Sequence, residues 1–538
     1  MARATKATAP KVSPPPWSSA PRLRVMLAER LGKIEFRVQG PFTIESLAGE
    51  TLLAQAATDC RWMARPLQTT PARMRHAVIV AAFADPRQAR RLVAELAGQG
   101  YEARVTELGF RPAPEEKVGH GKLRYRVICG AFDEMAGAAE LMTHFQNAWR
   151  PRLVRERVEA PTGRVEITNA GFQLDREIEQ GLRVRPAAGG SVTLFRLPCE
   201  RWSDSPLEDR RFSGALEFRV DNLGQLAVVN ELAVDDYLRG VLPTELEPGF
   251  PAEAQKAMAV AVRSMVLAMR GLRHVSEDWH FCAAGHCFHY SGLTRRQEAG
   301  SKAVADSAGE VLLCRGGVCD AVSHRCCGGH GENKENIWST PAEPVLAGRP
   351  DCRPRKPRRT RLEREEAARA WILEAPEACL CRVTRSDHPA LLERSRKDFR
   401  WKEVYLRAEL EEVVRRKTGV DLGTLFEIVP VRRGVSGRII ELELIGSRHN
   451  LRLQKELKIR EALSPGRLSS SCFTVHTDKD EEGLPRRFTL IGAGHGHGCG
   501  LCQVGAGALA EQGLDYRAIL EHYFPGTELK LLYAPVGE

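Results

Sequence analysis

The sequence predicts an α+β fold in which a mixed body of strands and helices carries a small module inserted near its N-terminus. Apolar and polar residues alternate over residues 22–60 and again over 165–230, which is typical of short strands with one buried face. A strand-and-helix pattern occurs twice between residues 76 and 150, and a nearly continuous apolar helix is predicted from Pro251 to Arg270. Because 538 residues are too many for one simple core, we expect several domains or one domain with insertions.

The composition is that of an ordinary globular protein with a net charge of +10, which favours an anionic partner such as nucleic acid, a membrane surface or a cell-wall polymer. Residues 1–21 are rich in Ala, Pro, Ser and Lys and predict a disordered lead-in. We expect neither a signal peptide before Arg22 nor a transmembrane segment, because no apolar run is long enough. The fifteen cysteines are odd in number and clustered, which favours reduced thiols and a metal site over a disulfide framework.

An internal repeat defines the inserted module, which we expect to span residues 75–158. The two copies begin with Val78–Phe83 and Tyr125–Phe132, and a helix should follow each. We expect Asp85 and Asp133 to cap these helices, because a carboxylate at that position accepts a backbone N–H. Strand, helix and strand, twice over, give a βαββαβ module of the ferredoxin type.

The segment Tyr237–Glu247 places two glutamates in a turn directly before the apolar helix. Pro251 suits the first turn of that helix, and Gly271 suits its end because glycine adopts a left-handed conformation readily. Arg263 lies inside the apolar helix, and a buried guanidinium needs a partner. Glu245 or an anionic substrate group could be that partner; a purely structural pair between arginine and a carboxylate is the alternative.

Glycine occupies every second position from Gly492 to Gly500. In an extended segment, one face would then lack side chains, and the other would display Ala493, His495, His497 and Cys499. A flat ring could approach the bare face closely. The alternative is tight packing of this face against another strand or helix.

Two histidines and two cysteines fall within fourteen residues: His274, Cys282, His286 and Cys287. Thiol and imidazole groups at this density suit tetrahedral zinc. Four protein ligands leave no open position for water, so we expect a structural zinc site that staples the loop after the apolar helix. His280 and His289 are alternative ligands, and buried thiols beside ordinary loop histidines are the alternative to a metal site.

Residues 351–370 are strongly charged and predict a solvated loop that runs into a surface helix. No aromatic residues interleave with the basic ones there, so we do not expect a nucleic-acid site. Residues 22–70 should form an N-terminal β segment of the main domain, and residues 160–538 the rest of that domain.

Six segments, in order along the chain, resemble the SpoIID/LytB family: Val228–Glu245, Cys282–Cys287, Cys327–Glu332, Phe399–Trp401, Arg433–Arg438 and Gly496–Ala506. The likeness runs from about residue 22 to residue 535. The inserted module, with its Tyr-x-Val-x-x-Gly-x-Phe pattern, resembles SPOR domains, which bind glycan strands stripped of their peptides. Its first copy departs from that pattern, because Ala81 and Ala82 stand where glycine is common.

The resemblance implies a lytic transglycosylase that cleaves the β-1,4 bond between MurNAc and GlcNAc in peptide-free glycan strands and leaves a 1,6-anhydro-MurNAc end. The catalytic glutamate of the family is matched here by Glu245, and Glu247 is the rival carboxylate. One carboxyl is sufficient, because the C6 hydroxyl of the muramic ring replaces the water that a hydrolase must activate. We expect the apolar helix to raise the pKa of Glu245 so that it starts protonated.

Further site residues follow from the same reasoning. The candidates for orienting the acid or the substrate are Arg263, His497 and Gln503, and those for binding the substrate are Gly496, Gly498, Gly505 and Tyr290. The zinc reported for some family members involves the region matched by His274–Cys287. The resemblance implies a location in the cell envelope, periplasmic or extracytoplasmic, with peptidoglycan as partner. Because the LytB branch includes enhancers of amidases, a noncatalytic wall-binding protein that stimulates an amidase is the alternative.

Overall fold

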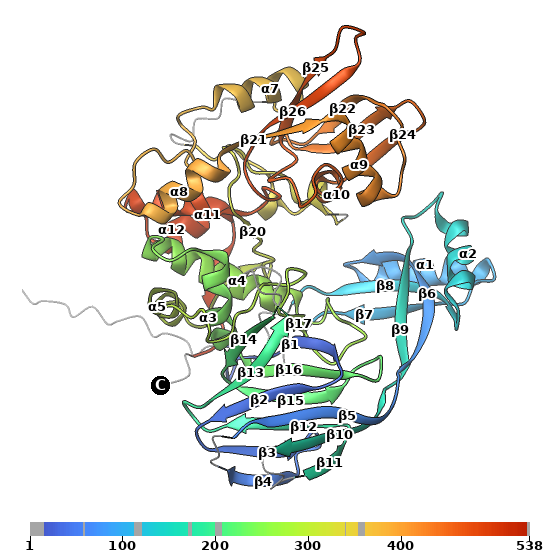
Figure 1. The fold of residues 1–538 in the computed structure, drawn as a ribbon, viewed down its shortest axis with the longest axis vertical. Coiled ribbons are helices and arrows are strands. Elements are labelled where there is room, and N and C mark those ends of the chain that lie inside the picture. Colours follow the sequence, from blue (N-terminus) through green and yellow to red (C-terminus); the bar gives the residue numbers. More distant parts are fainter. Residues whose placement is uncertain are drawn as a thin grey trace, which may run out of the picture.

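The computed structural model describes residues 16–56, 60–111, 121–169, 175–198, 207–338, 340–352 and 361–534. Figure 1 shows two lobes rich in strands, a layer of helices between them and a small module at one side. Helices and sheets both contribute to the core, which confirms the α+β class. Among the described residues, no helix combines the length and apolar character needed to cross a bilayer.

The lower lobe in Figure 1 consists of two sheets that pack face to face. One sheet has the order β17 (Phe281–Cys282), β1 (Arg22–Leu31), β16 (Leu226–Ala233), β15 (Ala215–Val220), β12 (Gly181–Pro186), β3 (Phe42–Ser46) and β4 (Thr51–Ala56). The other has the order β11 (Asp175–Glu179), β10 (Thr162–Asn169), β5 (Trp62–Thr70), β2 (Ile34–Gln39), β13 (Ser191–Pro198) and β14 (Leu207–Phe212). The ring of Phe36 in β2 lies 4.7 Å from that of Phe218 in β15, so the two sheets share one core.

The expected lead-in ends earlier than residue 21. Trp17 is only 3% exposed and belongs to the main hydrophobic core. Its backbone N–H donates a hydrogen bond of 2.8 Å to the carbonyl oxygen of Leu532, near the other end of the chain. A large apolar side chain can thus anchor a segment whose composition alone predicts disorder. Residues 1–15 lie outside the described residues.

The inserted module has the predicted βαββαβ order: β6 (Arg73–Phe83), α1 (Pro86–Gly98), β7 (Ala103–Leu108), β8 (Arg124–Phe132), α2 (Met135–Phe145) and β9 (Arg152–Glu159). Its strands form one antiparallel sheet in the order β7-β8-β6-β9, with a hydrophobic core of its own. Asp85 caps α1 by accepting the N–H of Arg87 at 2.8 Å, as predicted. The prediction for Asp133 was wrong, because its carboxylate pairs with Arg75 at 3.2 Å and Glu134 occupies the cap position.

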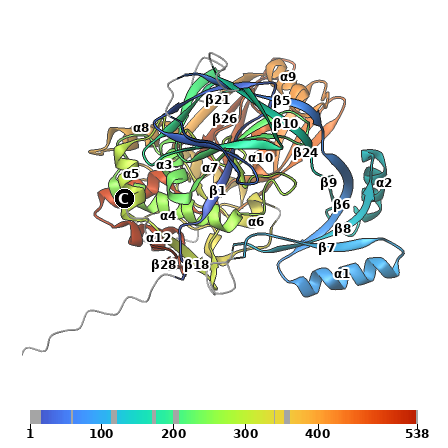
Figure 2. The same ribbon diagram turned by 90° about the horizontal axis from the view of Figure 1, so that it is seen from below.

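The module leaves the body from one sheet and returns to the same sheet. Thr70 at the end of β5 and Thr162 at the start of β10 are register partners. Seen from below, the module extends to one side of the body (Figure 2). Among the described residues, three ion pairs tie it to the rest of the chain: Arg157 with Asp278 at 2.8 Å, and Lys122 with Asp320 at 2.6 Å and with Glu343 at 2.9 Å.

The helical layer between the lobes contains α3 (Val234–Glu245), α4 (Ala252–Met269), α5 (Glu298–Asp306), α8 (Pro389–Asp398), α11 (Gln503–Glu511) and α12 (Tyr516–Tyr523). Helix α4 begins directly after Pro251, and Gly271 beyond its end has a φ of +75°. Almost every residue from Ala257 to Ala268 is buried, as the apolar sequence predicts.

Short elements complete this layer. One small sheet joins β18 (Glu310–Cys314) to β19 (Gly317–Val318) and to β28 (Glu528–Leu531). A second pairs β20 (Ser323–His324) with β27 (Leu501–Cys502), and α6 (Lys334–Ile337) and the 3₁₀ turn η1 (Pro344–Leu346) lie in the connection after β20.

The upper lobe has a core separate from the main one, so residues 160–538 do not form a single core. It contains α7 (Glu365–Glu374), β21 (Arg400–Leu406), α9 (Arg407–Thr418), β22 (Leu425–Arg433), β23 (Ile439–Gly446), β24 (Asn450–Gln454), α10 (Glu456–Ala462), β25 (Phe473–Lys479) and β26 (Pro485–Ala493). Its strands form two sheets, β21-β26-β25 and β22-β23-β24, around buried side chains such as Leu410 and Phe488. Of the predicted charged loop, residues 353–360 lie outside the described residues, and α7 is the helix that follows it.

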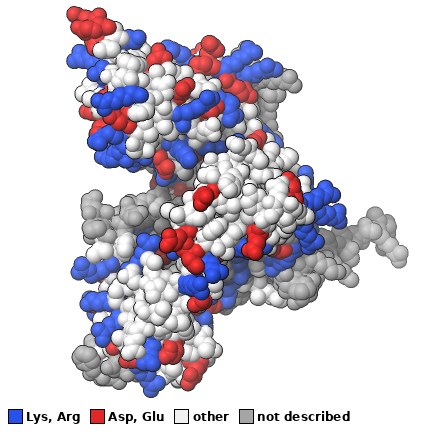
Figure 3. All heavy atoms as spheres, turned by 90° about the vertical axis from the view of Figure 1, so that its right-hand side faces the viewer, with Lys and Arg blue, Asp and Glu red and all other residues white. Residues whose placement is uncertain are grey.

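The positive net charge is not gathered into one patch on the face in Figure 3. Lys and Arg side chains are interspersed there with Asp and Glu over the lobes. A broad basic surface of the kind that binds nucleic acid is not seen on this face.

Candidate functional site

The fold brings the glutamate motif and the glycine-rich segment together. Glu245 is the last residue of α3, and Gln503 is the first residue of α11. The side-chain amide of Gln503 donates a hydrogen bond of 3.3 Å from Nε2 to Oε2 of Glu245. Two residues that are 258 positions apart in the chain therefore share one site, and Glu245 is half-buried there.

Arg394 of α8 organises this pair. Its Nη1 donates 2.5 Å to Oε1 of Gln503 and 3.1 Å to the backbone oxygen of Glu245. Because the guanidinium holds the amide oxygen, the amide nitrogen of Gln503 must point toward the Glu245 carboxylate. Arg394 is 4% exposed, and its guanidinium lies 4.9 Å from the centre of the Phe250 ring. The orientation of Gln503 is thus fixed by a buried cation.

The rival carboxylate has different surroundings. Glu247 forms an ion pair with Arg394, and its other oxygen lies 3.6 Å from Arg325. Its side chain is 42% exposed. A carboxylate between two guanidinium groups is stabilised in its charged form, which does not suit a proton donor.

The prediction that Arg263 pairs with Glu245 was wrong. Its guanidinium is fully buried and pairs with Asp235 in the first turn of α3 at 2.8 Å, not with Glu245. It also donates to the backbone oxygens of Glu310 at 3.1 Å and Val304 at 3.3 Å. Arg263 therefore joins α3, α4 and α5 as a structural residue, which was the alternative interpretation.

The glycine-rich segment is not an extended strand. Strand β26 ends at Ala493, β27 begins at Leu501, and the four glycines between them have φ values of +74° to +94°. An alternating bare face requires extended backbone, so the predicted face does not form. A Cβ at Gly496 would lie 3.1 Å from Cβ of His324, and one at Gly498 would lie 2.4 Å from Cζ of Arg438. Both positions are packed against the chain itself, and neither forms the expected open binding surface.

The other two candidates for substrate binding also lie inside the protein. A Cβ at Gly505 would lie 2.1 Å from the hydroxyl oxygen of Tyr523. Tyr290 is 2% exposed and donates its hydroxyl hydrogen to Oδ1 of Asn230 at 2.9 Å. The centre of its ring lies 5.0 Å from that of Tyr237 in the core, and the two rings are tilted by 39°. Neither position is open to a substrate in this structure.

His497 lies between two other rings. The centre of its imidazole is 4.9 Å from that of Trp338 and 5.6 Å from that of His324. Burial and the neighbouring His324 hold the pKa of His497 well below its ordinary value, so its ring is neutral near pH 7. The N–H of Cys499 donates 3.1 Å to Nδ1 of His497, which leaves the proton on Nε2.

The four predicted metal ligands come together. One ligand atom from each of His274, Cys282, His286 and Cys287 lies within 4.8 Å of the other three. Sγ of Cys287 is 3.5 Å from Nε2 of His274 and 3.6 Å from Nδ1 of His286, and Sγ of Cys282 is 3.8 Å from that same Nδ1. In a tetrahedral site, with Zn–S of about 2.3 Å and Zn–N of about 2.0–2.1 Å, sulfur and nitrogen are about 3.6 Å apart. The donor set and its spacing fit zinc.

The alternative ligands have other partners. Nδ1 of His280 accepts the backbone N–H of Arg24 at 3.0 Å, and burial lowers the pKa of His280 to about 4. The carbonyl oxygen of His289 accepts the hydroxyl of Thr244 at 2.7 Å. Among the described residues, neither joins the group of four.

Arg394 is the site residue that sequence reasoning missed. The signal was present, because Leu391, Arg394, Ser395 and Asp398 share one buried face of α8. A charged residue on the apolar face of a helix indicates a specific buried partner. Nothing in the sequence shows that this partner lies more than a hundred residues away.

Comparison with protein families matches three parts of the chain. Residues 222–313 match the stage II sporulation protein (SpoIID) family, and residues 73–150 match the SPOR domain. Residues 332–500 match a domain of unknown function, DUF8618. The first two matches contain Glu245, the four grouped metal ligands and the inserted module; the third contains most of the upper lobe.

Two relatives are similar over more than half of the chain. An uncharacterized protein of Brachyspira hyodysenteriae is 26% identical over 320 residues, covering 59% of this chain and 72% of that protein. The amidase enhancer of Bacillus subtilis is 25% identical over 300 residues, covering 54% of this chain and 40% of that protein. A protein of Burkholderia pseudomallei with a known crystal structure matches 32% of this chain and 27% of its own, with 14% identity and a TM-score of 0.15, which carries no argument about the fold.

Proposed function

Because the chain is a SpoIID/LytB-family protein with a SPOR domain, and therefore has a role at the cell wall, we propose that it is a peptidoglycan lytic transglycosylase. It cleaves the β-1,4 bond between MurNAc and GlcNAc in glycan strands that have lost their peptides, and it works in the cell envelope. The observation that carries this proposal is the contact of 3.3 Å between Gln503 and Glu245, which joins the glutamate motif to the glycine-rich segment in one site.

Glu245 performs both proton transfers. Its carboxyl group first donates a proton to the glycosidic oxygen, so the bond to C1 of the muramic ring breaks and the GlcNAc hydroxyl leaves. The C6 hydroxyl of the same ring then attacks C1, and its proton passes to the Glu245 carboxylate. No external water enters the product, which is why a second carboxylate is not required.

Gln503 and Arg394 hold the acid in position. The amide of Gln503 binds Oε2 of Glu245 and so fixes the orientation of the carboxyl group. Arg394 fixes Gln503 and pairs with Glu247, which keeps the second carboxylate charged beside the first. These contacts support Glu245 rather than Glu247 as the acid.

The test is digestion of peptide-free glycan strands, with 1,6-anhydro-MurNAc products measured by mass spectrometry. We expect the wild-type protein to form these products and Glu245→Gln to lower the rate by about 100-fold or more. Glu247→Gln should lower it by less than about tenfold, because it disturbs Arg394 without removing the acid. Glu298→Gln, an exposed carboxylate in the first turn of α5, is the matched control and should leave the rate unchanged. Full activity in Glu245→Gln would overturn the assignment.

A noncatalytic role is the second candidate, because a relative that matches 54% of this chain is named an amidase enhancer. In that case the protein binds the wall and stimulates an amidase without cutting glycan. Adding the protein to an amidase and intact sacculi separates the two. Faster peptide release, equal for wild type and Glu245→Gln and without anhydro products, would favour the enhancer.

We also propose that His274, Cys282, His286 and Cys287 hold a structural zinc ion. The donor set and the separations of 3.5–3.8 Å support it. Four protein ligands leave no position for water, so this ion would staple the loop after α4 and take no part in proton transfer. Metal analysis of Cys282→Ser, which should lose this ion, tests the assignment.

A further inference from the structure

A second group of metal-ligand atoms lies in the core, outside the four residues already assigned. One ligand atom from each of four buried residues lies within 4.8 Å of the other three: Cys327, Asp351, Cys381 and Cys502. Cys327 follows β20, Asp351 follows η1, Cys381 precedes α8, and Cys502 ends β27. The fold thus gathers three thiols and a carboxylate from four separate segments.

The spacing of these atoms suits a single metal ion. Sγ of Cys327 lies 3.5 Å from Sγ of Cys381 and 3.1 Å from Oδ2 of Asp351. Ligand atoms of a tetrahedral zinc with Zn–S of about 2.3 Å are about 3.6–3.8 Å apart, so binding requires these separations to widen by about half an ångström at most. A disulfide needs an S–S distance of about 2.0 Å, well below the 3.5 Å between Cys327 and Cys381. No disulfide forms among the described cysteines.

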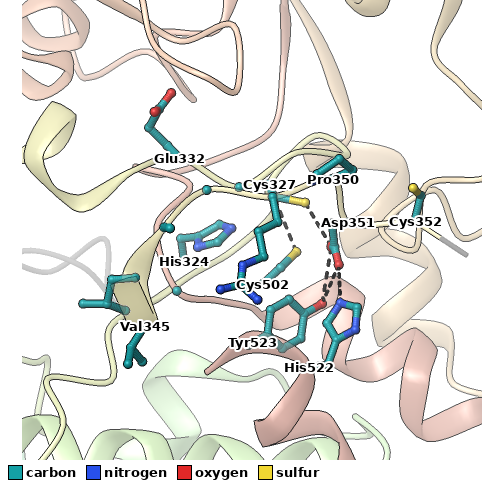
Figure 4. Close-up of a pocket in the computed structure, with 16 residues that line it drawn as sticks. His324, Cys327, Glu332, Val345, Pro350, Asp351, Cys352, Cys502, His522 and Tyr523 are labelled. Atoms are coloured by element: carbon teal, nitrogen blue, oxygen red, sulfur yellow. Dashed lines mark hydrogen bonds and ion pairs between the residues drawn. The ribbon is translucent and has the colours of Figure 1, made fainter. Parts of the chain in front are cut away.

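Neighbouring groups orient the ligands. The Asp351 carboxylate contacts Nε2 of His522 at 3.0 Å and accepts the hydroxyl of Tyr523 at 3.2 Å, as Figure 4 shows. Sγ of Cys502 accepts the N–H of Cys327 at 3.3 Å and the N–H of Gly505 at 3.4 Å. Donors of this kind offset the negative charge of thiolates and carboxylates and fix their direction, as in protein metal sites.

A cavity adjoins this group. Cys327, Asp351 and Cys502 line a cavity of about 300 Å³, together with His522 and Tyr523. Figure 4 shows the carboxylate and the two sulfur atoms facing the same space. The arrangement therefore combines ligands, outer hydrogen bonds and an adjoining cavity.

We propose that Cys327, Asp351, Cys381 and Cys502 bind a second zinc ion. Thiolate-rich tetrahedral sites select zinc among the common divalent ions. An iron–sulfur cluster would place its ligand sulfurs on different irons, which requires wider spacing than that of Cys327 and Cys381. With four protein ligands the site is closed, so the ion cross-links the fold and does not activate water.

The ion would fix the start of α11. Cys502 is the N-cap of this helix, and the next residue, Gln503, contacts Glu245. A metal bond to Cys502 would therefore fix the backbone at the start of α11 and, with it, the position of the Gln503 amide. Metal binding by the four residues requires only their own ligand atoms and is independent of the role of Glu245.

The experiment measures zinc per chain in the full-length protein by mass spectrometry of metals after exhaustive dialysis. We expect two zinc ions in the wild type, one in Cys381→Ser, one in Cys282→Ser and none in the double variant. Cys472→Ser is the matched control, because Cys472 is 2% exposed and belongs to neither group, and it should keep both ions. One zinc in the wild type that is lost in Cys282→Ser and retained in Cys381→Ser would overturn the proposal.

A measurement on the wild type covers the case in which Cys381→Ser fails to fold. X-ray absorption at the zinc edge should give an average of 2.5 sulfur ligands per zinc, because one group has two thiols and the other has three. A value of two sulfurs per zinc with one zinc per chain, or iron in place of the second zinc, would refute the assignment. Neither readout depends on glycan cleavage, so its failure is distinct from failure of the proposed activity.

Discussion

The two groups of candidate zinc ligands differ in how the chain builds them. The first lies in one short segment, His274–Cys287, and includes the exposed His286. The second is buried throughout, and its members Cys327 and Cys502 are 175 positions apart. A cross-link between distant segments restrains the unfolded chain more than a local one, and a buried ligand left without its metal costs more than an exposed one. The local site should therefore stabilise a loop, whereas the dispersed site should stabilise the whole helical layer.

The largest effect should come from breaking the dispersed site. Cys381→Ser should lower the free energy of unfolding by about 3–5 kcal/mol, because it removes one ligand and leaves the others buried without an ion. Denaturant unfolding followed by circular dichroism measures this change. The control Cys472→Ser should cost about 1 kcal/mol or less. Equal losses in the two variants would mean that burial alone, and not a metal, explains the effect.

The ion pairs of Asp320 also link distant segments, but they do so without a metal, so they can be compared with the dispersed site. The Asp320 carboxylate lies 2.6 Å from Nζ of Lys122 in the module and 2.9 Å from Nζ of Lys334 in α6. Burial by itself would raise the pKa of Asp320, but these two ammonium groups lower it well below its ordinary value. Asp320→Asn should cost about 2–3 kcal/mol at pH 7, because Lys334 is buried.

The pH dependence of that variant has a definite sign. A carboxylate with a lowered pKa in the folded state stabilises the fold above its ordinary pKa of about 3.9, and this contribution is lost as the pH falls below that value. The stability difference between wild type and Asp320→Asn should therefore be constant from pH 5 to 7 and shrink below about pH 4. Thermal unfolding across this range measures it, and a difference that grows on acidification would contradict the assignment.

Cys502 of the dispersed site directly precedes Gln503 of the proposed catalytic pair, whereas no ligand of the local site is adjacent in sequence to that pair. Gln503→Ala should lower glycan cleavage by about 10- to 100-fold, because Glu245 loses the amide that orients it. Gln503→Glu tests the same contact with a side chain of similar size, and it should also slow the reaction because a carboxylate cannot donate the hydrogen bond near pH 7. Rates with peptide-free glycan provide the measurement. Unchanged rates in both variants would remove Gln503 from the site.

Breaking the local site should have the smallest effect. Cys282→Ser should lower the free energy of unfolding by about 1–2 kcal/mol. The effect is small because the ion would link side chains that fall within a stretch of only fourteen residues, and because one of its ligands, His286, is exposed. Glycan cleavage should stay within about threefold of the wild type. Denaturant unfolding measures the stability change, and the cleavage assay measures the rate. A loss of stability as large as that of Cys381→Ser would contradict the predicted difference between the two sites.

Local patterns predicted local structure well. The βαββαβ module, the Asp85 cap, helix α4 and the grouping of the four ligands from His274 to Cys287 all follow from residues that are near one another in the sequence. The two wrong predictions for individual side chains, Asp133 and Arg263, have one cause. Each charged side chain found a partner from another element, and sequence spacing does not show which element that is.

The prediction for the glycine-rich segment was wrong for a different reason. Alternating glycines were interpreted as an extended strand, yet Gly494, Gly496, Gly498 and Gly500 all adopt positive φ. Glycine therefore occupies alternate positions because the backbone between β26 and β27 is left-handed at those residues. The alternation does not indicate a pleated face. The dispersed ligands Asp351 and Cys381 were equally invisible, because no pattern connects them before the chain is folded.

Because Thr70 and Thr162 face each other, the SPOR module could be exchanged as a unit. Since β5 and β10 are already antiparallel neighbours, a tight turn could join them directly, and neither sheet of the sandwich would change its register. The contacts given up would include the ion pairs of Arg157 with Asp278 and of Lys122 with Asp320, and the backbone hydrogen bond from Lys122 to Ala268. A gene could acquire, lose or exchange this module at a single point in the chain while both sheets of the sandwich kept their strand order.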